Sequence, residues 1–169
     1  MKQNRVYQLT TSAVLAALAL VLSFLEHWLP PLPVPGAHLG LANILVMYAL
    51  AQLSFPCAAG ITAVKAVYAL FRGPIACLMS TAGGFAALLA MALFYKCCRE
   101  RMSFIGIGII GAAAHNVGQL LVSVCVLGSA MWYYTPVLLF LAIPTGALTG
   151  CVLNVVYPYL RQISIRERT

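Results

Sequence analysis

The sequence predicts an all-α integral membrane protein: a bundle of six transmembrane helices with both termini in the cytosol. The chain of 169 residues is 63% hydrophobic and only 8% charged, whereas a soluble domain carries about 25% charged residues. Its apolar residues gather in six runs, and most Lys and Arg residues lie in short clusters beside these runs. Because no polar segment is long enough to form a soluble domain, we expect a single membrane domain over residues 1–169.

The first apolar run covers residues 9–29 and follows Lys2 and Arg5. A basic start before an apolar stretch is also typical of a signal peptide. This run is longer than a usual signal core, lacks a clear cleavage site, and ends near Trp28, which suits a membrane interface. We therefore expect a retained helix. Four prolines in residues 30–36 then exclude a helix and favour an extended segment at the membrane surface or over the helix ends.

Two short runs follow, at residues 39–55 and 56–71. Pro56, at the break between them, suits the first turn of a helix. Both runs are short for a full span, so two interpretations stay open. They form two compact spans, or they form a re-entrant hairpin, which membrane proteins tolerate when it is buried in protein.

Three longer runs complete the bundle, at residues 74–95, 104–127 and 133–157. Each is long enough to cross a bilayer, which takes about 20 apolar residues. Pro144 falls inside the last run, where a proline removes a backbone hydrogen bond. We therefore expect a kink in the sixth helix.

The basic residues orient this bundle. With six crossings, three basic clusters fall on one face, which is the cytosolic face by the positive-inside rule. The exception is Arg72, which falls on the outer side between the third and fourth runs. The clusters are Lys2 and Arg5; Lys96, Arg99 and Arg101; and Arg161, Arg166 and Arg168.

The acidic residues exclude several kinds of chemistry. The sequence has no aspartate, and its only acids are Glu26, Glu100 and Glu167. Enzymes that hold Mg²⁺ on a diphosphate use several carboxylates, and paired-carboxylate acid–base chemistry has no evident pair here. We therefore predict no catalytic residues.

The net charge, the cysteines and the histidines limit which partners and cofactors we expect. The net charge is +7, and most of the basic residues that produce it lie beside apolar runs. They therefore indicate membrane topology and contact with anionic membrane lipids rather than nucleic-acid binding. The six cysteines form no Cys-x-x-Cys pair, and the three histidines are far apart in the sequence. We therefore expect no metal site and no cofactor.

Polar residues inside the apolar runs mark a candidate substrate-binding site. His115, Asn116 and Gln119 lie in the fifth run, where polar groups are costly unless they have partners or face a cavity. His115 and Gln119 are four residues apart and so share a helix face. The other candidates map to the outer half of the bundle: Glu26, His38, Asn43, Lys65 and Arg72.

We predict that these residues line a polar cavity that opens to the outside. Lys65 and Arg72 would hold an anionic group and Glu26 a basic or hydroxyl group, while amides and imidazoles orient the ligand. Alternatives stay open for individual residues. Glu26 and Arg72 form an interfacial salt bridge, Lys65 extends to a surface, or the fifth-run residues hold neighbouring helices together.

Small residues recur at four-residue spacing. Ala13 and Ala17 do so in the first run, and Gly146 and Gly150 in the sixth. Such faces let helices approach closely. The general interpretation is packing within the bundle, and the alternative is that Ala13 and Ala17 dock a partner membrane protein.

Three ordered blocks resemble a known family, and the resemblance extends over nearly the whole chain. They are residues 35–43 (Pro-Gly-Ala-His-Leu-Gly-Leu-Ala-Asn), 80–84 (Ser-Thr-Ala-Gly-Gly) and 111–119 (Gly-Ala-Ala-Ala-His-Asn-Val-Gly-Gln). These blocks are similar to those of the bacterial Gx transporter family, long labelled "heptaprenyl diphosphate synthase component I".

The resemblance implies a fold similar to the substrate-binding (S) components of energy-coupling-factor transporters, in the bacterial cytoplasmic membrane. In those proteins a small-residue face on helix one contacts the coupling subunit, a pattern that Ala13 and Ala17 match. Relatives also occur beside flavin-linked electron transfer and quinone synthesis. A synthase as in the family label would need Asp-Asp-x-x-Asp motifs for Mg²⁺, and this chain has no aspartate.

We therefore expect a multi-pass subunit for uptake or binding of a small vitamin-, flavin- or isoprenoid-like molecule. The sequence has no Gly-x-x-x-x-Gly-Lys-Ser/Thr loop, so energy would come from a transmembrane coupling subunit with its ATPases, or from an ion gradient. The alternative is a non-catalytic accessory component of polyprenyl diphosphate or quinone metabolism, or of flavin-linked electron transfer.

Overall fold

The computed structural model describes residues 5–28, 40–97 and 103–166. The regular structure in these ranges is entirely helical, which confirms the all-α prediction. Two short 3-10 helices, η1 (Leu70–Arg72) and η2 (Ser129–Tyr134), accompany the α-helices. The α-helices are α1 (Arg5–His27), α2 (Asn43–Gln52), α3 (Phe55–Ala69), α4 (Pro74–Cys97), α5 (Phe104–Leu127) and α6 (Thr135–Arg166).

Several predictions from the sequence fall on other parts of the chain. The proline-rich segment 30–36 and the candidate ligand His38 lie outside the described residues. So do Lys2, Arg99, Arg101 and Arg168 of the basic clusters.

Within the described ranges, four helical segments are long and apolar enough to cross a membrane, namely Val6–Glu26, Pro74–Cys97, Phe104–Leu127 and Ser129–Tyr159. The helices between the first two of these segments are shorter. α2 has 10 residues and α3 has 15, which correspond to about 15 and 22 Å at about 1.5 Å per residue. The hydrocarbon core is about 30 Å thick. The protein is therefore a multi-pass membrane protein, and six complete spans remain a prediction.

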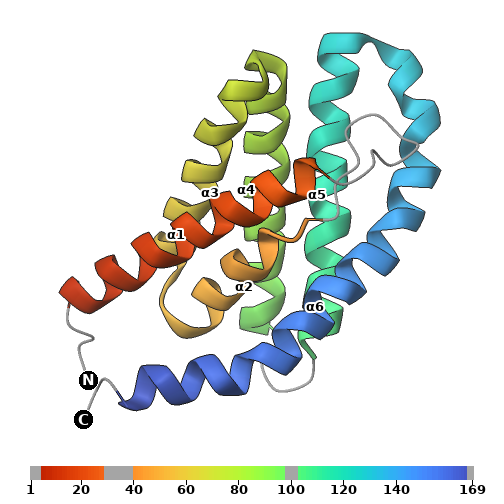
Figure 1. Ribbon diagram of the computed structural model, residues 1–169. Coiled ribbons are helices and arrows are strands. Elements are labelled where there is room, and N and C mark those ends of the chain that lie inside the picture. Colours follow the sequence, from red (N-terminus) through yellow and green to blue (C-terminus); the bar gives the residue numbers. More distant parts are fainter. Residues whose placement is uncertain (1–4, 29–39, 98–102, 167–169) are drawn as a thin grey trace.

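The helices form a bundle in which α3, α4 and α5 stand side by side and α1 crosses them obliquely (Figure 1). α5 packs mainly against α4 and α6, and α1 packs against α3. α6 curves along the bundle and carries Pro144 and Pro158 within it. The first turn of α1 and the last turn of α6 lie at the same end of the molecule (Figure 1).

Glycines permit the close contact between α5 and α6. A Cβ atom on Gly146 would meet the backbone of Ile109, and one on Gly150 would meet the backbone of Ile105. Gly108 faces Gly146 and Gly150 in the same way from α5. The small-residue spacing in the sixth run therefore serves packing within the bundle, as the general interpretation predicts.

The core lies around α2. Every residue from Ile44 to Ala49 is buried, together with Ile61 of α3, Leu88 of α4 and Leu153 of α6. The outward faces of the long helices are apolar as well, as expected where lipid replaces water. Polar side chains that lie inside this bundle therefore need partners within the protein or in a bound molecule.

Candidate substrate-binding site

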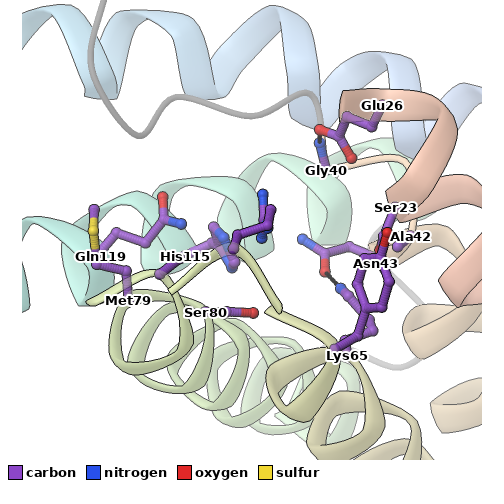
Figure 2. Close-up of a pocket in the computed structure, with 13 residues that line it drawn as sticks. Ser23, Glu26, Gly40, Ala42, Asn43, Lys65, Met79, Ser80, His115 and Gln119 are labelled. Atoms are coloured by element: carbon purple, nitrogen blue, oxygen red, sulfur yellow. Dashed lines mark hydrogen bonds between the residues drawn. The ribbon is translucent and has the colours of Figure 1, made fainter. Parts of the chain in front are cut away.

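One cavity in the described structure collects most of the predicted site residues. It has a volume of about 180 Å³ and is lined by α1, the start of α2, α3, η1, α4 and α5 (Figure 2). The predicted residues that line it are Glu26, Asn43, Lys65, Arg72, His115 and Gln119, and the additional ones are Ser23, Gly40, Ala42, Tyr68, Ala76, Met79 and Ser80.

A tight turn before α2 places Asn43 at the cavity. Gly40 has φ +73°, a left-handed conformation that favours glycine. The Asn43 backbone N–H donates to Gly40 O at 2.8 Å, so the helix begins at Asn43 rather than near residue 39 as the apolar run indicated. The Gly40 N–H in turn donates to Glu26 Oε1 at 2.6 Å. The last turn of α1 therefore holds the turn that starts α2.

Lys65 projects from α3 towards the same turn. Its Nζ donates to Asn43 Oδ1 at 2.6 Å, and the two residues are drawn together on one side of the cavity (Figure 2). The side chain is half-buried, and its ammonium group ends on Asn43 at the cavity. Asn43 neutralises none of the lysine's charge, because an amide oxygen supplies only a dipole.

α5 forms the opposite wall. His115 and Gln119 occupy successive turns and both contact Gly83 of α4, where a Cβ atom would lie 2.8 Å from Gln119 Cγ and 2.9 Å from His115 O. Gln119 is 5% exposed, and among the described residues its Oε1 has no hydrogen-bond partner. A buried acceptor without a donor costs free energy unless a ligand or water supplies one.

Asn116 behaves differently from its neighbours on α5. Its Nδ2 donates to Leu138 O of α6 at 2.7 Å. It lines a separate cavity of about 20 Å³ together with Thr145 and Thr149, and a space of that size holds about one water molecule. Asn116 therefore joins α5 to α6, which is the helix-packing alternative, and it does not line the larger cavity. His115 lines both cavities.

The charges around the cavity of about 180 Å³, which we call the Lys65 cavity, do not cancel. Glu26, Lys65 and Arg72 all line it, and the described structure contains no salt bridge among the three. The predicted alternative of a Glu26–Arg72 salt bridge is thus not seen. The half-buried Lys65 and the exposed Arg72 face one carboxylate, which leaves the cavity with a net positive charge when all three are ionised, although solvent screens the charge of Arg72 more than that of Lys65.

Sequence reasoning missed three hydroxyl-bearing residues that line the cavity. Ser23 precedes Glu26 by three positions, and Tyr68 follows Lys65 by three, so each shares a helix face with a predicted residue. Ser80 belongs to the Ser-Thr-Ala-Gly-Gly block at residues 80–84. The same-face spacing was therefore a signal in the sequence that could have identified the first two.

A second, shallower feature lies between α1 and α3. This α1–α3 groove has a volume of about 530 Å³, and its lining includes Ser12, Ala13, Ala16 and Gly60. Ala13 and Ala17 are both exposed, but only Ala13 lines the groove. Within the described ranges, no group of three His, Cys, Asp or Glu side chains is placed to hold a metal ion.

Comparison with known proteins gives one family and one solved structure. The family described as "Heptaprenyl diphosphate synthase component I" matches residues 15–156. No curated protein matches the chain. The fold is similar to that in "Structure and mechanism of the S component of a bacterial ECF transporter", with a TM-score of 0.64, 20% sequence identity, and coverage of 98% of this chain and 99% of that one. The expected resemblance to S components is thus confirmed at the level of the fold.

Proposed function

The chain belongs to the family described as heptaprenyl diphosphate synthase component I, and we propose that it is the substrate-binding subunit of a small-molecule uptake system. It would lie in the bacterial cytoplasmic membrane with its termini in the cytosol and with the Lys65 cavity facing outwards. The similar fold of an S component supports this function.

One observation carries the proposal: a partly charged cavity is built into an otherwise apolar bundle. Glu26, Lys65 and Gln119 come from three different helices and line the same space. Placing such groups in a membrane protein is costly, so they generally mark a substrate or ion pathway. A protein that only packed helices together would gain nothing from a lysine facing an open cavity.

The same residues favour recognition over catalysis. A general acid or base needs a partner group and a reacting bond within reach, and Glu26 is the only carboxylate among the described residues that line the cavity. Binding without chemistry requires a separate source of energy for release. We assign that role to a coupling subunit docked at the α1–α3 groove, where Ser12 Oγ has no hydrogen-bond partner among the described residues.

The second candidate is a membrane accessory subunit for polyprenyl diphosphate metabolism, which the family description favours. It would present a lipid substrate to a separate catalytic chain. The absence of aspartate from the sequence argues against catalysis by this chain itself.

Thermal stabilisation of the purified protein separates the two candidates, because a ligand that binds only the native state raises its melting temperature. The ligands would be vitamins, flavins, nucleobases and isoprenyl diphosphates. We expect stabilisation by a water-soluble small molecule, weakened in Lys65→Ala and Gln119→Ala but not in the control Lys96→Ala at the end of α4. Stabilisation by an isoprenyl diphosphate alone would reject the uptake function in favour of the accessory one.

A further inference from the structure

We propose that the cavity selects a compact organic monoanion, about one ring in size, that also presents an N–H or O–H donor at the end remote from its anionic group. This inference rests on the proposed function, since it names the substrate class of the same site. Its three parts come from the volume, the charge and the hydrogen-bonding capacity of the cavity.

The volume limits the ligand to about one ring. The cavity measures about 180 Å³, and an engineered protein cavity of about 150 Å³ binds benzene. Pockets for drug-sized molecules are larger, at about 300–1,000 Å³. A single ring with one or two small substituents fills this space, whereas a three-ring flavin or a polyprenyl chain would extend beyond it.

The net positive charge of the cavity lining favours a ligand with a single negative charge. Lys65 and Arg72 provide two positive charges against the one carboxylate of Glu26. That carboxylate already accepts from the Gly40 N–H. The Lys65 ammonium has three N–H donors and gives one of them to Asn43, so two remain for an anion. A carboxylate on the ligand would supply the counter-charge, while a diphosphate would bring more negative charge than the site balances.

The Gln119 end of the cavity favours a ligand that carries a hydrogen-bond donor. Gln119 is buried, lines the cavity, and carries an Oε1 acceptor that no described residue satisfies. Figure 2 shows Gln119 and Lys65 on opposite sides of the space, with Ser80 between them. A ligand that reaches both must therefore carry its donor across the ring from its anionic group.

Binding measured by calorimetry on the purified full chain in detergent tests this ligand class. The probes are 4-aminobenzoate and orotate, which combine one ring, one carboxylate and N–H donors. Aniline and uracil lack the carboxylate, benzoate lacks the N–H donor, and riboflavin and farnesyl diphosphate test the size limit. We expect at least one of the first two to bind about tenfold or more tightly than its matched analogues, because an analogue loses either a charged hydrogen bond to Lys65 or the donor for the buried Gln119 acceptor.

Substitutions at the two ends of the cavity test whether Lys65 causes the preference for a carboxylate and Gln119 the preference for an N–H donor. Lys65→Gln should remove the preference for 4-aminobenzoate or orotate over the neutral ring, and Lys65→Arg should retain it. Gln119→Leu should remove the preference for 4-aminobenzoate over benzoate. The matched controls are Lys96→Gln and Gln52→Leu, because neither residue lines the cavity, and ligand-free melting curves verify that every variant folds.

The outcomes distinguish this inference from the function on which it rests. Saturable binding of riboflavin or of neutral rings, with no preference for 4-aminobenzoate or orotate, would leave an uptake subunit standing and overturn the ligand class. Binding of farnesyl diphosphate alone would overturn both. Failure of both carboxylates when another water-soluble compound binds would also reject the class, and failure of every compound would count against the cavity as a binding site.

Discussion

Lys65 Nζ donates to Asn43 Oδ1 at 2.6 Å and thereby ties the middle of α3 to the first residue of α2. The hydrogen bond from Gly40 to Glu26 extends this connection to the last turn of α1. A ligand that engages Lys65 therefore contacts a group linked through two hydrogen bonds to the helix that carries Ala13. This arrangement offers a physical connection between the cavity and the α1–α3 groove.

Asn43→Leu should destabilise the protein and weaken ligand binding together. The substitution removes the described acceptor of the Lys65 ammonium and leaves that cation without a partner inside the bundle. Loss of a hydrogen bond to a charged group costs about 1.5–3 kcal/mol, to be measured by thermal unfolding in detergent. Asn154→Leu, at an exposed position of α6, is the matched control. Equal melting temperatures for the two variants would contradict the importance of the Lys65–Asn43 contact.

Gly83→Ala should perturb the cavity wall. The new Cβ atom would lie 2.8 Å from Gln119 Cγ and 2.9 Å from His115 O, so α4 and α5 must separate or Gln119 must move. Overpacking of this kind costs about 1–3 kcal/mol, and we expect ligand affinity to fall with the melting temperature.

Gly60→Ala is the control for this overpacking. A Cβ atom at Gly60 of α3 meets nothing within 4 Å, and alanine favours a helix over glycine by about 0.5–1 kcal/mol. We therefore expect unchanged or raised stability and full ligand affinity. A melting temperature for Gly60→Ala as low as that for Gly83→Ala would mean that the clash is not the cause.

Asn116→Leu should separate helix packing from ligand binding. Asn116 joins α5 to Leu138 O of α6 and does not line the Lys65 cavity. Its loss should cost about 0.6–1.5 kcal/mol, as for other hydrogen bonds between membrane helices, while ligand affinity stays unchanged. Gln119→Leu should show the opposite pattern in the same assays. Reduced affinity in Asn116→Leu at temperatures where it is folded would place Asn116 in the binding site after all.

Ala13→Leu should disrupt docking of a coupling subunit without changing ligand binding. Ala13 lines the α1–α3 groove, and a larger side chain would fill it. The measurement is co-purification of a tagged chain with transmembrane proteins from its native membrane, followed by their identification by mass spectrometry. Val14→Leu is the control, because Val14 is exposed on α1 and does not line the groove. Retention of the same coupling subunit by Ala13→Leu would exclude this groove as its docking surface.

The proposed orientation of the bundle in the membrane predicts which of two engineered cysteines a reagent labels from outside. In a variant without the native cysteines, Arg72→Cys should react with a membrane-impermeant maleimide added to whole spheroplasts, because η1 would lie on the outer side. Lys96→Cys, in the last turn of α4, should react only after the membrane is opened, because the proposed orientation puts that end of α4 in the cytosol. The reverse pattern would invert the topology and place the Lys65 cavity on the cytosolic side.

The class of the protein and most of its candidate site follow from the order of its amino acids alone. Apolar length and clustering of charge are local properties, so they are visible without a fold, and polar residues in apolar runs are conspicuous for the same reason. The six-helix topology assigns a set of polar residues to the outer half of the bundle or its midplane. Five of them line the cavity: Glu26, Asn43, Lys65, Arg72 and Gln119.

Which of the polar residues contact one another became evident only from the packing of the helices. Asn116 and Gln119 are three positions apart on α5, yet Asn116 bonds to α6 and Gln119 faces the cavity beside Gly83. Their roles depend on which helix lies opposite each face of α5. That arrangement depends on close helix contacts at Gly83, Gly108 and Gly146. These contacts join residues far apart in the sequence, so the sequence does not show which helix packs against which glycine.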